Sequence, residues 1–410
     1  MTGLSVKKNL IWNSAGSFSY SLCQWILTVL VVRLSPNYDA AGVLALGMAV
    51  SNISAPIALY KIRSYQVSDV HRAVSAREYV GFRIVTTVAA LLITVVYTLL
   101  TCSPSTYAAV LLYVVFRSGD TFIDVLHGVD QQHFRMDYCG ISMLARGVLF
   151  LIAFAATLWA TGNLELAIFA MIVVTFPVII YDVRKASTLD DVRPLITRQS
   201  TRKLAIECLP AVIGMVCCFS VASIARQYLA ATWGDAALGI YASVCTPVVI
   251  IQACASYVYA PLLGIFAQKY DEGDVAGFLR LLGKTSVAIL AVFIAASIGF
   301  ALFGEFLLGL VFGASIIPYS YLLVPAIICS GVAAYIAFMS DLLIAVRRLR
   351  ENLIANAIAF AACLPATWFC VNTWDMNGAS FATIVAYGIG SAIMAVYLIK
   401  DLRALKKERP

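Results

Sequence analysis

The sequence predicts an all-α integral membrane protein of about twelve transmembrane helices, arranged as two pseudo-symmetric six-helix bundles around a central cavity. Its composition suits a membrane, because 61% of the 410 residues are hydrophobic and only 12% are charged, against about 25% charged in soluble domains. Apolar runs of about 20 residues, long enough to cross a bilayer as a helix, recur along the whole chain. We therefore expect no soluble domain large enough to house an enzyme.

Each apolar run predicts one span. The first six are expected at residues 10–34, 41–60, 82–101, 107–128, 138–160 and 164–181, and the second six at 204–231, 237–266, 283–303, 319–346, 353–370 and 378–399. A polar connector at 191–203 separates an N-terminal lobe, 1–190, from a C-terminal lobe, 204–410. No cleavage site follows a short apolar stretch near the start, so we expect the first helix not to be removed as a signal peptide.

The lysines and arginines predict how the spans are oriented. Of the 29, 25 lie on the side of the membrane that this topology gives to both termini, and the other four are Arg33, Arg117, Arg146 and Arg226, within spans or at an outer end. Basic loops remain in the cytoplasm, so both termini are expected there, in a multi-pass protein of the cell membrane. The net charge of +7 then reflects topology, and we expect no nucleic-acid partner.

Two pairs of similar phrases indicate that the halves are repeats. DAAGVLA begins at Asp39 after the first span and DAALGIYA at Asp235 after the seventh, while DVLHGV begins at Asp124 and DLLIAV at Asp341. Each half has an even number of spans, so both would enter the membrane in the same sense, related by an axis along the bilayer normal. We expect alternating access by two rocking lobes.

Charges within the fourth predicted span mark a candidate site. Arg117, Asp120, Asp124 and His127 follow at spacings of three, four and three, which places them on one helical face. A charge in the membrane costs about 3 kcal/mol on insertion scales, so this face should look inward. We expect Arg117 to meet an anionic substrate and Asp120 or Asp124 to exchange a coupling proton or cation. The alternative is a neutralised structural pair with an interfacial end.

Two further arginines, Arg146 in the fifth span and Arg226 in the seventh, have no opposite charge at helical spacing on their own helices. Each needs an anion, which a neighbouring helix could supply, for example through Glu207 or Asp341, or which the substrate could supply, since guanidinium binds phosphate in bidentate geometry. We predict Arg146 and Arg226 as substrate-binding residues and Asp341 as a further ion-coupling candidate. Arg33 is expected to be an interfacial anchor.

The first span carries a stripe of uncharged polar residues: Asn13, Ser17, Ser21, Gln24 and Thr28. This stripe could contact sugar hydroxyls, chiefly through Asn13 and Gln24, or hold helices together through hydrogen bonds. The cysteines lack zinc-ligand spacing and are interpreted as small packing residues. We predict no catalytic residue, no metal and no cofactor.

Several segments carry a family resemblance: Lys8-Asn9-Leu10 with Asn13 and Gly16, Arg33-Leu34, Tyr38 to Gly42, Arg226-Gln227-Tyr228-Leu229, Gly239-Ile240-Tyr241-Ala242, Tyr257 to Leu263 with Pro261, and Asn377-Gly378-Ala379. They resemble polysaccharide flippases, which move O-antigen or exopolysaccharide repeat units, of the multidrug/oligosaccharidyl-lipid/polysaccharide (MOP) exporter superfamily. The resemblance covers nearly the whole chain. It implies transfer of undecaprenyl-diphosphate-linked oligosaccharide to the outer leaflet through a cationic cavity. In relatives an acidic residue often precedes the arginine of the seventh helix, where this chain has Ala225, which puts ion coupling there in doubt.

Three functions follow from these features. The first is a flippase for lipid-linked oligosaccharide in cell-surface polysaccharide biosynthesis, with membrane lipids and polysaccharide assembly proteins as partners. The second is a cation-coupled small-molecule or multidrug exporter of the same superfamily, which should need an acidic cavity. The third is a membrane glycan polymerase, which would need acid, base or metal groups near an outer loop, whereas the outer loops here are short. We expect the flippase and not an enzyme.

Overall fold

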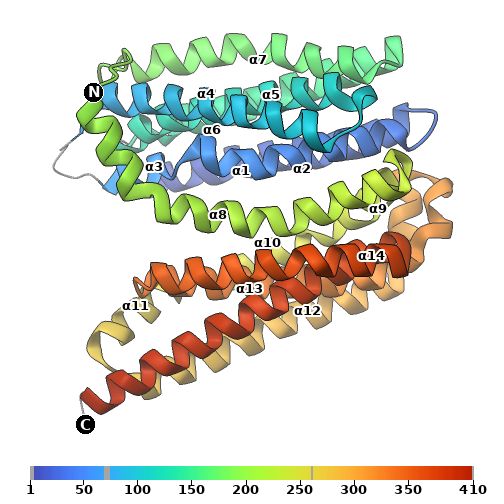
Figure 1. Ribbon diagram of the computed structural model, residues 1–410. Helices are drawn as coiled ribbons and strands as arrows, with labels where there is room; N and C mark the ends of the chain where they lie inside the picture. The colour runs from blue at the N-terminus through green and yellow to red at the C-terminus, as the bar shows by residue number, and fades with distance from the viewer. Residues whose placement is uncertain (1–3, 69–73, 260–261, 409–410) are drawn as a thin grey trace. The chain divides into compact units, whose positions relative to one another are not determined.

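The computed structural model describes residues 4–68, 74–259 and 262–408, and these residues are almost entirely helical (Figure 1). Its first helices are α1 (Val6–Leu34), α2 (Asp39–Leu59), α3 (Ile62–Ser68), α4 (Ala76–Thr101), α5 (Tyr107–Gln132), α6 (Met136–Thr161) and α7 (Leu164–Ala186). They are followed by α8 (Arg198–Trp233), α9 (Asp235–Val248), α10 (Ile250–Tyr259), α11 (Leu263–Glu272), α12 (Val275–Phe312), α13 (Leu323–Ala345) and α14 (Leu349–Glu408). Short 3-10 helices, η1 (Pro104–Thr106) and η3 (Ala314–Leu322), precede α5 and α13.

Twelve membrane crossings can be traced in the described residues. Ten helical segments are long and apolar enough to span a bilayer. The segment that contains α14 makes two crossings, because the backbone leaves helical geometry at Trp374 and Asp375 and a Cβ on Gly378 would lie 2.2 Å from the carbonyl oxygen of Cys370. That contact requires the chain to fold back. The twelfth crossing is α5, which falls outside the ten because it carries four charges between Arg117 and Asp130. The expected membrane fold class is confirmed, and the chain is a multi-pass membrane protein.

Two spans have bounds that differ from the predicted ones, and proline, glycine and capping residues lie at the differences. The predicted eighth span, 237–266, divides into α9, α10 and the start of α11. Pro247, near the end of α9, removes one backbone hydrogen bond of that helix just before the break. Residues 260–261, including Pro261, lie outside the described residues. The predicted ninth span, 283–303, is the longer α12. Its N-cap Asp274 accepts a hydrogen bond from the amide of Gly277, and Gly313 ends it in a positive-φ conformation.

The chain divides into two compact units, Met1–Val212 and Ile213–Pro410. Within the first unit α2 packs on α4 and α5, and α4 packs on α5. Within the second, α10 packs on α12 and α13, and α12 packs on α13. The second, third and fourth spans of each unit therefore contact one another in the same way, as expected for a repeat. The lobe limits of 1–190 and 204–410 and the central cavity remain predictions from the sequence.

A close backbone contact joins α1 to α6 in the first unit. A Cβ on Gly16 would lie 2.6 Å from the Cα of Gly140, and a Cβ on Gly140 would lie 2.5 Å from the carbonyl oxygen of Trp12. Small residues permit such approach between membrane helices, where dispersion contacts replace the hydrophobic effect as the driving force. This contact fixes the distance between the two helices that carry Tyr20 and Arg146.

We expect Gly16→Val or Gly140→Val to push α1 and α6 apart and to destabilise the protein by about 1–3 kcal/mol, the usual cost of overpacking. Thermal unfolding of the purified protein, followed by tryptophan fluorescence, measures this loss. Gly283→Ala is the matched control, since a Cβ at that position would have nothing within 4 Å. An unchanged melting temperature in both valine variants would contradict the assigned contact.

Candidate functional site

Five polar residues from three helices form a cluster inside the first unit, which we name the arginine cluster: Tyr20 and Gln24 of α1, Arg117 and Asp120 of α5, and Arg146 of α6. Asp120 lies at its centre. One carboxylate oxygen accepts hydrogen bonds from Arg117 at 2.5 Å and from the Tyr20 hydroxyl at 2.6 Å, and the other accepts from Arg146 at 2.6 Å. Gln24 donates to the Tyr20 hydroxyl at 3.2 Å. The sequence-predicted residues Gln24, Arg117, Asp120 and Arg146 therefore come together.

Aromatic packing holds Tyr20 in this position. Its ring packs edge-on against Phe150 of α6 at a centroid distance of 5.6 Å, and the Arg146 guanidinium lies 5.0 Å from the centre of the Tyr20 ring. Phe150 is fully buried. Tyr20 is thus held by an apolar contact on one side and by the Asp120 carboxylate at its hydroxyl.

The two arginines of the cluster differ in exposure. The Arg146 side chain is 6% exposed, whereas that of Arg117 is 31% exposed. Asp120 can neutralise only one of the two positive charges, so the cluster as a whole carries one net positive charge. Arg117 is therefore the more accessible of the two and Arg146 is buried in its pair with Asp120, and substrate binding by either stays a prediction. The anion that Arg146 needed is Asp120, and not Glu207 or Asp341.

A cavity of about 150 Å³ opens beside Arg117 within the first unit. It is lined by Arg117, Asp120 and Asp124 of α5 together with polar residues of α2 and α4, among them Ser51 and Thr94. At about 30 Å³ per water molecule it holds a few waters, which would hydrate the guanidinium. It is too small for an oligosaccharide.

Asp124 occupies a separate ion-pair network. One of its oxygens accepts a hydrogen bond from Arg83 of α4 at 2.8 Å and the other from Arg63 of α3 at 3.3 Å. Arg83 is fully buried and also donates to the carbonyl of Ala58 in α2 at 2.8 Å. The chain reaches α3 through Tyr60 and Lys61, two non-glycine residues with positive φ. Both oxygens of Asp124 are thus held by arginines, and ion coupling at Asp124 stays a prediction.

The second unit carries Arg226 on α8 and Asp341 on α13. Arg226 is partly buried and acts electrostatically on Tyr241, Cys245 and Cys329. Among the described residues it forms neither a hydrogen bond nor an ion pair. Asp341 accepts a hydrogen bond from the Tyr259 hydroxyl of α10 at 3.0 Å, so the structure does not pair Asp341 with Arg226.

Two other predicted partners lie outside the arginine cluster. Asn13 is partly buried on α1 and makes no hydrogen bond in the described part of the chain. Glu207 of α8 accepts a hydrogen bond from the Tyr65 hydroxyl. Their roles as a sugar contact and as a partner for an arginine find no geometric support, and the Asn13 site remains a prediction.

The sequence reasoning missed Tyr20, Arg63 and Arg83. Tyr20 could have been found, because it lies three residues after Ser17 and four before Gln24, on the face of the polar stripe. Arg63 and Arg83 fall among the basic connections in the topology that the sequence predicts. Nothing local in the sequence shows that Arg83, seven residues into α4 from its start at Ala76, points into the bundle.

The fold is shared with known membrane transporters. No protein-family model matches the chain, and no curated protein matches it. Among solved structures, it is similar to a multidrug resistance MATE family transporter of the MOP superfamily, with a TM-score of 0.73, 13% identity, and coverage of 95% of this chain and 96% of that chain. It is also similar to the lipid II flippase MurJ, with a TM-score of 0.74, 11% identity, and coverage of 97% and 90%.

A third similar structure is a MOP superfamily transporter from Pyrococcus furiosus, described as having a binding pocket of reverse polarity that suggests a different function. Its TM-score is 0.59 at 13% identity, and the match covers 97% of this chain and 95% of that one. Identities this low show a common fold. They confirm the superfamily fold that the sequence resemblance implied and leave the substrate open.

We expect Arg83→Gln to destabilise the protein by about 3–5 kcal/mol, because it removes one partner of a buried ion pair and leaves polar groups unsatisfied. Thermal unfolding of the purified variant measures the loss. Arg77→Gln on the same helix is the control, because its pair with Asp191 spans 3.6 Å between exposed side chains and should contribute less than about 1 kcal/mol. Equal effects of the two changes would argue against the buried network.

We expect Asp120→Asn and Arg146→Gln each to destabilise the protein, and the double variant to lose less than the sum of the two. The coupling should be about 1–3 kcal/mol, as for contacting charges. A double-mutant cycle on thermal stability measures it. Asp120→Asn combined with Gly283→Ala should be additive, and additivity in the Asp120 and Arg146 cycle itself would refute the pairing.

Proposed function

We propose that this membrane protein is a flippase that moves lipid-linked oligosaccharide, carried on undecaprenyl diphosphate, across the cytoplasmic membrane for cell-surface polysaccharide biosynthesis. The observation that carries this proposal is the surplus of positive charge on intramembrane arginines. The arginine cluster keeps one net positive charge and exposes Arg117 to a small cavity. Arg226 in the second unit has no carboxylate partner among the described residues.

Electrostatics favours an anionic ligand at these positions. A positive charge at membrane depth is costly, and a ligand that brings negative charge recovers that cost. A diphosphate suits an arginine best, because guanidinium donors match two phosphate oxygens at once. The cavity beside Arg117 is too small for a glycan, so we propose that only the anionic group of the substrate approaches Arg117 and that the sugars lie elsewhere.

The similar structures are consistent with a transporter of either an anionic lipid or a drug. One neighbour is described as a lipid II flippase, others as multidrug transporters, and one as having a pocket of reverse polarity. The alternative function is a cation-coupled small-molecule or multidrug exporter, which Asp341 would favour if it faced the transported cation. The net positive charge of the arginine cluster, beside the cavity that Arg117 lines, favours the flippase. A glycan polymerase is the least favoured function.

Several details belong to the same proposal. The distribution of basic residues predicts that both termini lie in the cytoplasm. Polysaccharide assembly proteins are the proposed partners. Transport proceeds by alternating access of the two lobes. Since Asp120 and Asp124 each accept hydrogen bonds from two arginines, protonation of either would cost ion pairs. Asp341, which accepts a hydrogen bond from the Tyr259 hydroxyl, stays a proposed ion-coupling residue.

We expect wild-type protein to restore surface polysaccharide in a flippase-deficient strain, and Arg117→Gln to reduce the restored polymer about 10–100-fold, the loss expected when a hydrogen-bonded charge contact disappears. Arg226→Gln should act in the same direction. Arg117→Lys should retain part of the activity, because it keeps the charge without the bidentate geometry. Surface polymer and lipid-linked precursor are measured at matched membrane expression.

Arg77→Gln, which alters an exposed arginine, is the control and should behave as wild type. Accumulation of precursor inside the cell with Arg117→Gln supports the proposal. Full polymer levels in both glutamine variants would remove the arginines from the substrate path. Resistance to cationic drugs that depends on Asp341, without restored polymer, would favour the exporter.

A further inference from the structure

A second polar cluster lies in the first unit, where α5 ends and α6 begins. It consists of His127 and Asp130 of α5, Cys139 of α6 and Asp182 of α7, and we name it the histidine cluster. All four residues are at most 2% exposed. One ligand atom each from His127, Asp130 and Cys139 can be chosen so that all three lie within 4.8 Å of one another.

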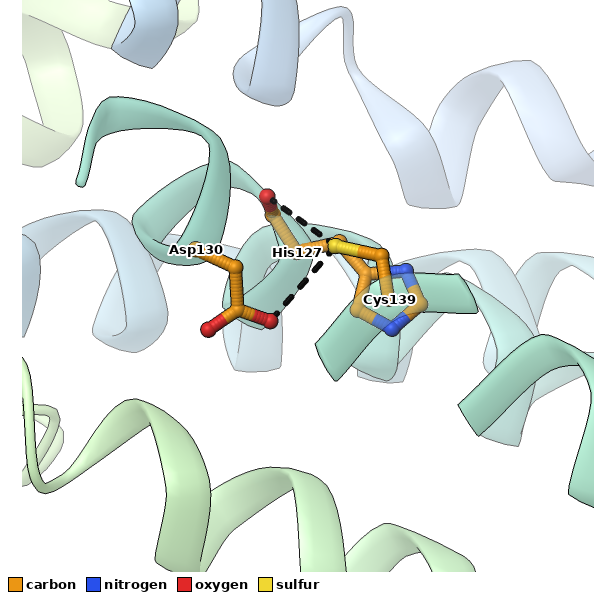
Figure 2. A group of neighbouring side chains, drawn as sticks. All are labelled: His127, Asp130 and Cys139. Atoms are coloured by element: carbon orange, nitrogen blue, oxygen red, sulfur yellow. Dashed lines mark hydrogen bonds between the residues drawn. The ribbon is translucent and has the colours of Figure 1, made fainter. Parts of the chain in front are cut away.

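The hydrogen bonds among the described residues leave several polar atoms of the histidine cluster without a partner. The Cys139 thiol donates to one oxygen of Asp130 at 3.6 Å and to the backbone carbonyl of His127 at 3.9 Å (Figure 2). Ser142 donates to one oxygen of Asp182 at 2.6 Å. The other oxygen of each carboxylate and Nε2 of His127 have no hydrogen-bond partner within the described residues.

No basic side chain among the described residues forms an ion pair with Asp130, and Asp182 has only the His127 ring at 3.8 Å. Arg63 and Arg146 act on the cluster from a distance, but their donors bind Asp124 and Asp120. Two buried carboxylates without a close cation would cost several kcal/mol. A bound cation removes this cost.

We propose that the histidine cluster is a binding site for a divalent transition-metal ion of the zinc class, with His127, Asp130 and Cys139 as ligands. The donor set selects the ion: nitrogen, thiolate sulfur and carboxylate oxygen together suit Zn²⁺, whereas Mg²⁺ and Ca²⁺ prefer oxygen alone. Asp182 lies 3.8 Å from Nε2 of His127, where it would orient the imidazole by accepting the Nε2 proton while Nδ1 binds the ion, as carboxylates do beside many zinc-bound histidines.

Small side-chain movements would bring the ligand atoms to the distances that a zinc ion requires. Tetrahedral zinc with these ligands needs ligand atoms about 3.3–3.8 Å apart, and the Cys139 sulfur already lies 3.6 Å from an Asp130 oxygen. Side-chain shifts of about 1 Å would close the rest. The ion would join α5 and α6, with Asp182 of α7 behind the histidine, across a tight α5–α6 connection in which Phe134 has a φ of 55°. No pattern in the sequence indicates this site, because the ligands come from two helices and lack a recognised zinc spacing.

The test uses full-length protein in detergent, stripped with a chelator, titrated with Zn²⁺ alone and desalted before metal analysis. We expect about one tightly bound zinc per chain, lost in His127→Ala, Asp130→Asn and Cys139→Ser. Asp182→Asn should weaken binding about 10–100-fold, the usual cost of losing a carboxylate behind a ligand. With Co²⁺ as the probe, wild type should show a thiolate charge-transfer band that Cys139→Ser lacks.

His133→Ala and Cys208→Ser are matched controls, since they remove a histidine near the site and a buried cysteine outside it. Both should bind zinc as wild type does. Cys139→Ser changes a buried thiol to a hydroxyl of similar size, so its cobalt spectrum decides the matter even if His127→Ala fails to fold. Absence of stoichiometric zinc in wild type, or equal zinc in wild type and Cys139→Ser, would overturn the proposal.

Discussion

The free-energy cost of placing charge inside a bilayer governs how the helices of the first unit pack. Helix α5 carries Arg117, Asp120, Asp124 and Asp130 within one crossing, and such charges need partners inside the protein. Asp120 reaches Arg146 on α6, and Asp124 reaches Arg63 and Arg83 on α3 and α4. The packing of α5 against α2, α4, α6 and α7 is therefore also an arrangement of ion pairs. The apolar faces of the outer helices, such as those bearing Leu100 and Trp159, are left for lipid.

The carboxylates of α5 have different kinds of partner along the length of the helix. In its middle, arginines supply the positive charge and leave a surplus that suits an anionic substrate. Toward its end, Asp130 and the neighbouring Asp182 have only a thiol, a serine hydroxyl and a histidine close by. In the roles that we propose, the first arrangement serves transport and the second stabilises the α5–α6 connection, so a change in one need not affect the other.

Much of the fold could be predicted from the sequence, because bilayer thickness converts hydrophobic length directly into spans. The pairing of Arg117 with Asp120 also follows from local spacing. Contacts between helices could not be predicted in this way. Arg146 lies beside the Tyr20 ring because Gly16 and Gly140 bring α1 and α6 together, and Arg83 points inward for reasons that its flanking residues do not reveal. Partners that lie on different helices depend on rotation and depth, which a single sequence does not encode in any short pattern.

The charge content of α5 also bears on how the chain enters the membrane during synthesis. Four charges at roughly 2.5–3.5 kcal/mol each oppose insertion more strongly than the apolar residues of the same segment favour it, at about 0.3–0.6 kcal/mol each. Arg83 on α4 is made before α5, but Arg146 on α6 is made after it. Integration of α5 into lipid must then wait for α6, so that these helices leave the insertion machinery as a group and not one at a time.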